Sequence, residues 1–261
     1  LKDKYTVTFA CPAQKTERSI DLTELGVREE VIVLNSSSFD LFIQGESPTI
    51  VMFDRFMMEE QFGWRVTKNC PHALKILDTE DLHSLRKVRH ESFKKNREFK
   101  LSQLLSSDLA KREIASILRC DVSLIVSEYE IQLLREFFKI DKRLYIHLPF
   151  LLDRIEESRR EEWSTYNERS HFVFIGNFLH APNVNAVVQL KKFIWPIIRK
   201  ELPKAELHVY GAYASNHILQ MNNNKEGFIV KGAVDNAFEI IENARVMLAP
   251  LMFGAGIKGK L

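Results

Sequence analysis

The sequence predicts an α/β protein with two doubly wound units, and three observations support this fold class. Short runs rich in Val, Ile and Phe alternate with helical patterns along most of the chain, as in successive β-α-β units. The run 49–53 is almost wholly apolar, which suits a strand buried on both faces of a parallel sheet. Four later runs each end at Gly or Pro, which predicts a row of loops along one edge of a second sheet.

The first half of the chain contains the first predicted unit. Its apolar and β-branched runs predict strands over 5–10, 31–34, 49–53, 73–77, 122–126 and 143–147. Helical periodicity predicts helices from 57 to about 68, over 104–119 and over 128–138. Ser127 is expected to cap the last of these helices, and the basic segment 94–100 is expected to be a loop.

The segment 153–170 carries dense alternating charge and is expected to form a solvated helix between domains. We therefore expect an N-terminal, acceptor-side domain over 1–150, a linker over 151–170 and a C-terminal domain over 171–261. The chain starts within a strand pattern, so the first strand and helix of the first domain are expected to be missing. The end of the second domain is expected to be missing as well.

In the second unit, each expected strand ends at a glycine or a proline. These strands cover 171–175, 206–210, 228–231 and 245–249, and they end at Gly176, Gly211, Gly232 and Pro250. Between the first two strands we expect a helix with Pro182 at its first position, bent near its end by Pro196.

Composition limits the class of partner. The formal net charge is only +2, which offers no global field for nucleic acid and allows at most peripheral membrane contact. Three widely spaced cysteines favour a reducing, cytoplasmic setting over a disulfide framework or a zinc site. No apolar run approaches the roughly 20 residues that span a bilayer.

The segment 249–261, APLMFGAGIKGKL, combines glycines and lysines after a buried strand. Glycine lets a ligand approach bare amide groups, and a loop of this kind presents N–H donors that suit phosphate. Lys258 and Lys260 would add positive charge. The spacing of a P-loop is absent.

Several strings together resemble the donor-binding domain of retaining family-4 glycosyltransferases: FIGN (174–177), PNVNA (182–186), VYG (209–211), GAVD (232–235), APL (249–251) and GAGIKGK (254–260). The segments 53–65 and 77–83 resemble bacterial-type members of the same group. The resemblance implies the GT-B architecture, in which two Rossmann-like domains with parallel sheets face each other across a cleft.

The resemblance also implies an activity. A nucleotide-diphosphate sugar would donate its sugar to a hydroxyl of a glycan, lipid or small molecule, with retention of configuration and without a cofactor or an obligatory metal. Two rivals stay open, a non-catalytic scaffold or binding protein of the same shape and a nucleotide-sugar epimerase. The donor base and sugar, the acceptor and the oligomeric state are not predicted.

Donor-side residues carry over from the resemblance position by position. They are Gly176, Asn177, His180, Gly211, Val234, Gly254, Gly256, Lys258 and Lys260. The alternatives without a ligand are that the glycines are required only by their turns, that His180 caps a helix and that the lysines are solvated. Met252 and Ala255 depart from the family pattern, in which Arg and Glu are common at these positions, and this keeps the scaffold alternative open.

Acceptor-side residues follow the strand ends of the first domain. The resemblance implies catalytic or sugar-contacting roles for Glu80, Asp81 and His83. Asp54 and Arg55 would contact the acceptor, although an internal ion pair between them is an equal alternative.

Overall fold

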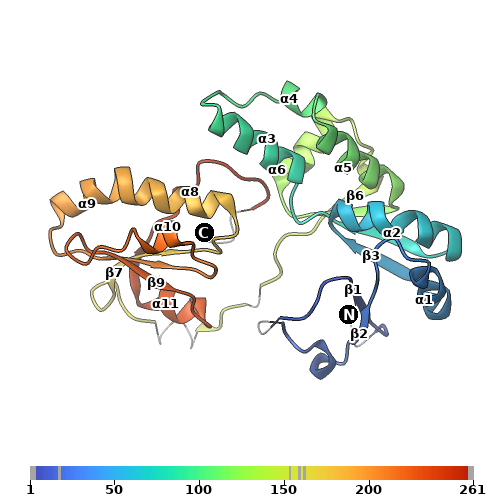
Figure 1. Cartoon of the computed structure of the whole chain (residues 1–261), viewed down its shortest axis with the longest axis horizontal. Coiled ribbons are helices and arrows are strands. Elements are labelled where there is room, and N and C mark those ends of the chain that lie inside the picture. Colours follow the sequence, from blue (N-terminus) through green and yellow to red (C-terminus); the bar gives the residue numbers. More distant parts are fainter. Residues whose placement is uncertain (1–3, 17–18, 153, 158–159, 161–162, 258–261) are drawn as a thin grey trace. The chain divides into compact units, whose positions relative to one another are not determined.

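A computed structural model describes residues 4–16, 19–152, 154–157, 160 and 163–257 (Figure 1). By residue contacts the chain divides into two compact units. Unit 1 contains Leu1–Leu82 and Asp108–Pro149, and unit 2 contains His83–Ser107 and Phe150–Leu261. Each unit contains a four-stranded parallel sheet.

The main sheet of unit 1 has the strand order β3-β4-β5-β6. These strands are Ile50–Asp54, Leu74–Asp78, Val122–Ile125 and Tyr145–His147, close to the predicted runs. Phe53, Leu77 and Ile125 are buried on one face of the sheet. The prediction that the run 49–53 is buried on both faces was wrong, because Ile50 and Met52, which point to the other face, are 37% and 48% exposed. Asp54 pairs with Asp78, so the carboxyl ends of β3 and β4 lie side by side.

A separate parallel pair joins β1 (Thr8–Cys11) to β2 (Arg28–Val31). The prediction of a strand over 31–34 was wrong in its bounds, because only Val31 belongs to β2. The pairing with β1, which begins where the Arg28 amide donates to the Val7 carbonyl, selects the polar residues that precede the apolar run. Val31 is 77% exposed, so burial did not decide this strand.

The helices of unit 1 differ from prediction mainly at their ends. They are α1 (Ser38–Glu46), α2 (Arg55–Asn69), α5 (Asp108–Arg119) and α6 (Glu128–Gln132), with a π-helical continuation over Leu133–Phe137 and short 3-10 turns at Leu22–Leu25 and Lys142–Leu144. Helix α1 was not predicted, and α2 starts two residues before Met57. The Ser127 cap is confirmed, because its hydroxyl accepts from the Glu130 amide.

The single helix predicted over 104–119 is in fact two, because α4 (Ser102–Leu105) ends before α5 begins. The Ser106 hydroxyl donates to the Gln103 carbonyl at 3.1 Å, a local bond that competes with helical pairing. Helix α3 (His83–Lys94), which belongs to unit 2 with α4, was also not predicted.

The sheet of unit 2 has the order β10-β7-β8-β9, and all its strands are parallel. The strands are β7 (Ser170–Ile175), β8 (Leu207–Tyr210), β9 (Phe228–Gly232) and β10 (Ala244–Met247), which confirms the four predicted strands. Alternate residues serve opposite faces: Phe174 and Val209 join one buried cluster, and Val173 and Tyr210 join another. Helices lie on both faces of this sheet (Figure 1).

One helical stretch follows β7, as α8 (Ala181–Gln189), a π-helical turn (Leu190–Ile194) and α9 (Trp195–Glu201). Pro182 is the second residue of α8, one position later than predicted. The π-helical turn comes directly before α9, where Pro196 has no N–H to offer an earlier carbonyl. Two shorter helices complete the unit, α10 (Asn216–Leu219) and α11 (Ala237–Asn243).

Part of the predicted charged helix at 153–170 lies outside the described residues. The prediction was wrong for its second half, because residues 163–169 form turns and irregular structure and Ser170 begins β7. Within the described part of the chain, no helix has the length and apolar character needed to cross a bilayer.

Candidate functional site: the carboxyl edge of the second sheet

The strand order of unit 2 creates a topological switch point. The chain runs from β7 outward to β8 and β9, then returns to the other side of β7 to form β10. The loops after β7 and β10 therefore leave neighbouring strands at the same edge of the sheet. Ligands of open α/β sheets bind outside the carboxyl ends of the strands at such a point. The two predicted donor loops meet at this position of the sheet.

The loop after β7 is held by its own polar groups. The Asn177 side-chain oxygen accepts from the Leu179 amide at 2.8 Å, and its carbonyl accepts from the Asn183 side chain at 2.8 Å. His180 is exposed and precedes α8 without a side-chain capping bond. The Asn177 side chain thus has a structural partner within the loop, while its role toward a donor stays a prediction.

Gly211 is required by packing. A Cβ at Gly211 would lie 2.0 Å from the Gly176 carbonyl oxygen and 2.5 Å from the Phe178 ring, both closer than real Cβ contacts. The loops after β7 and β8 can approach each other only because Gly211 has no side chain. This requirement holds with or without a ligand.

Two predicted donor residues lie at the carboxyl end of β9. Gly232 is the last residue of this strand, and Val234 lies two residues beyond it. The Val234 side chain packs against the cluster formed by Val173, Tyr210 and Ala244. Its side chain is half-buried against this cluster, and contact of its main chain with a nucleobase stays a prediction.

The loop after β10 is called the glycine loop here and comprises Pro250–Ile257 in the described residues. Leu251 packs against the main cluster of unit 2, and Phe253 is buried. Gly256 has φ +65°, a conformation that favours glycine. Lys258 and Lys260, the predicted phosphate ligands, lie outside the described residues.

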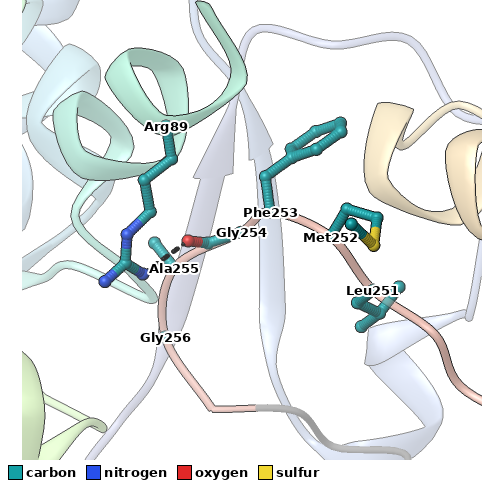
Figure 2. Close-up of a pocket in the computed structure, with 7 residues that line it drawn as sticks. All are labelled: Arg89, Leu251, Met252, Phe253, Gly254, Ala255 and Gly256. Atoms are coloured by element: carbon teal, nitrogen blue, oxygen red, sulfur yellow. Dashed lines mark hydrogen bonds between the residues drawn. The ribbon is translucent and has the colours of Figure 1, made fainter. Parts of the chain in front are cut away.

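The glycine loop lines a pocket of about 180 Å³ together with Arg89 (Figure 2). Small-molecule pockets are commonly about 300–1,000 Å³. A pocket of this size would hold part of a nucleotide-diphosphate sugar rather than the whole molecule.

The sequence did not point to Arg89 as a site residue. Its guanidinium donates to the Gly254 carbonyl at 2.8 Å across 165 residues of sequence. The neighbouring His90 ring stacks on Phe253 with centroids 4.3 Å apart. Burial, and secondly the charge of Lys94, lowers the pKa of His90. The absence of Gly and Pro from 83–94 could have predicted helix α3, but no local signal predicts its contact with the glycine loop.

In unit 1, Asp54 and Arg55 form an ion pair. The Arg55 guanidinium donates to both Asp54 carboxylate oxygens, at 3.0 and 2.8 Å, and lies 3.8 Å from Glu80. The hydrogen bond with Asp54 raises the pKa of Arg55. Burial raises the pKa of Glu80, and the charge of Arg55 opposes that rise. Arg55 and Glu80 have φ +68° and +55°, a strained backbone of the kind that gathers at functional sites.

The other predicted catalytic residues lie in the connection from β4 to α3. Asp81 is buried, and His83 is half-buried at the start of α3. Asp81 belongs to unit 1 and His83 to unit 2. Among the described residues, no three His, Cys, Asp or Glu side chains gather as metal ligands would.

A comparison with protein families gives a match over the segment that contains the second sheet. Residues 169–261 match the sequence model of the family described as Glycosyl transferases group 1. The match covers the switch point, the glycine loop and every predicted donor residue. No curated protein matches the chain significantly.

Among solved structures, a mutant of S. aureus TarM in complex with fondaparinux, alpha-GlcNAc-glycerol and UDP is similar with a TM-score of 0.51 and 13% identity, over 80% of this chain and 38% of TarM. The lipopolysaccharide outer core galactosyltransferase WaaB has a TM-score of 0.48 and 12% identity, over 87% of this chain and 60% of WaaB. S. aureus MnaA with UDP has a TM-score of 0.46 and 9% identity, over 87% of this chain and 61% of MnaA.

The chain thus spans less than two thirds of the length of these structures. The likeness to TarM and the two parallel sheets confirm the predicted fold class, α/β with Rossmann-like units of the GT-B type.

Proposed function

We propose that this protein is a glycosyltransferase that moves a sugar from a nucleotide-diphosphate donor to a hydroxyl acceptor with retention of configuration. The observation that carries the proposal is the group 1 glycosyltransferase match over 169–261. UDP in the TarM structure, whose fold is similar, supports a nucleotide donor. The glycan, lipid or small-molecule nature of the acceptor is left open.

In the proposed reaction, the bond from the anomeric carbon to the diphosphate oxygen breaks and a bond to the acceptor oxygen forms. The acceptor proton passes to a base, for which His83, Asp81 and Glu80 are the candidates. Negative charge grows on the departing diphosphate. Amides of the glycine loop, with Lys258 and Lys260, would stabilise this charge more in the transition state than in the ground state.

The proposed chemistry needs no cofactor and no obligatory metal, since lysines and amides supply the positive potential at the diphosphate. Activity should therefore survive EDTA. The three free cysteines support a reducing, cytoplasmic setting.

The first test is titration of UDP, GDP and other nucleoside diphosphates by calorimetry. Lys258→Ala should weaken binding by about tenfold, because a charge-assisted contact with phosphate is lost. Lys204→Ala is the matched control, because Lys204 is exposed just before the amino end of β8, at the opposite sheet edge. Equal affinity in wild type and Lys258→Ala would remove Lys258 from the mechanism, and no binding by wild type would reject the proposal.

The second test separates the rivals. Incubation with nucleotide sugars and a panel of hydroxyl acceptors should yield an attached sugar, whose anomeric configuration NMR compares with that of the donor. An inverted product would reject retention. A free epimerised nucleotide sugar would favour the epimerase, and nucleotide binding without turnover would favour the scaffold.

A further inference from the structure

We propose that Arg89 is a positioning residue that holds the glycine loop in one conformation. The identity of the ligand that this loop binds rests on the proposed function. The contact itself stands on the packing of unit 2, to which α3 and the loop both belong.

Three side chains of α3 contact two adjacent residues of the glycine loop, Phe253 and Gly254. Arg89 donates to the Gly254 carbonyl at 2.8 Å. The His90 ring stacks on Phe253 at 4.3 Å with an interplanar angle of 9°, and the Phe93 ring lies 5.1 Å from the same ring. Figure 2 shows the Arg89 side chain extended from its helix to the loop. Phe253 anchors the loop by burial, and Arg89 anchors the backbone beside it.

The backbone needs such an anchor because Gly254 and Gly256 have no side chains to pack, and glycine has the greatest conformational freedom to lose. The Gly254 carbonyl and the Ala255 amide belong to one planar peptide and point in opposite directions. A carbonyl held by Arg89 therefore fixes the direction of the Ala255 N–H. An amide with a fixed direction needs no reordering when an anion binds.

Among the described residues that line the pocket, one has a cationic side chain. Met252, in the glycine loop, is 57% exposed at the edge of this pocket. Arg89 brings a guanidinium to that pocket from a helix far away in the sequence.

The direct test is hydrogen exchange by mass spectrometry on the full chain without ligand. Arg89→Met keeps the apolar stem and removes the donors. We expect amides of 253–256 to exchange at least about tenfold faster in Arg89→Met, while those of β7 and β8 are unchanged. Lys87→Met, an exposed cation on the same helix, is the control and should leave all rates unchanged. Arg89→Lys should restore part of the protection, because an ammonium can also donate to the carbonyl.

Unchanged exchange at 253–256 in Arg89→Met would overturn the positioning role. Equal acceleration along α3 itself would also overturn it, since the variant would then have lost the helix rather than one contact.

Titration with UDP and with inorganic pyrophosphate separates this inference from the proposed function. We expect Arg89→Met to bind both probes at least about tenfold more weakly than wild type, with Arg89→Lys between them. If wild type binds neither probe while exchange rises in Arg89→Met, the donor role fails and the positioning role stands. If wild type binds both and Arg89→Met binds them equally, Arg89 has no positioning role toward the ligand.

Discussion

The Glu130 carboxylate accepts a hydrogen bond from the Leu82 backbone amide at 3.3 Å, and Glu130 is wholly buried. Glu130 lies in the first turn of α6, whereas Leu82 ends the connection that carries Glu80 and Asp81. Thr79 donates from its hydroxyl to the Leu124 carbonyl at 2.9 Å in the same connection. Two neighbouring elements of unit 1 thus hold the loop that contains the predicted acceptor-side residues.

Glu130→Ala should destabilise the protein by about 1–3 kcal/mol, because it leaves a buried amide without its acceptor. Glu130→Gln keeps an acceptor oxygen and should cost less. Urea denaturation measures both. Glu128→Ala, exposed in the same first turn, is the control and should change stability by no more than about 0.5 kcal/mol. Equal losses in Glu130→Ala and Glu130→Gln would mean that the bond to Leu82 is not the source.

Gly211→Ala should destabilise unit 2 by about 1–3 kcal/mol or more, because its Cβ would overlap the Gly176 carbonyl, which is backbone and cannot move aside freely. Gly45→Ala in α1 meets no atom within 4 Å and should stabilise by about 0.5–1 kcal/mol. Thermal unfolding of the two variants should therefore shift in opposite directions. A neutral Gly211→Ala would show that the two loops do not approach each other in this way.

Stability should fall as the pH drops below about 6.5, the ordinary pKa of histidine. Burial lowers the pKa of His171, and the stacked His208, with ring centroids 4.1 Å away, lowers it further. Glu206 opposes this shift and Lys231 adds to it. The unfolded chain therefore takes up a proton at His171 before the folded chain does, which favours unfolding through that window.

Urea midpoints at pH 7.5 and 5.5 measure this effect. His171→Asn removes the titrating group and suits the φ of +48° at this position, so the difference between the two midpoints should shrink. His217→Asn, at an exposed histidine, should leave the difference as in wild type. An unchanged difference in His171→Asn would assign the pH dependence to other groups.

Local patterns predicted most strands because a buried parallel strand needs a short apolar run, and that need is written in neighbouring residues. They failed where partners were distant. Pairing with β1 placed β2 at Arg28–Val31 rather than over the apolar run that follows. A hydroxyl bond at Ser106 divided a periodic stretch into α4 and α5.

By itself, the sequence determined the α/β class and the Gly and Pro ends of the strands of the second unit, while the phosphate-binding role of the glycine loop stays a prediction. Only the tertiary structure decided that β10 pairs with β7, which brings the two predicted donor loops to one switch point, and that Arg89 contacts Gly254. Apolar periodicity records which face of an element is buried. The choice of neighbour across 165 residues depends on packing of the whole unit, which no local pattern encodes.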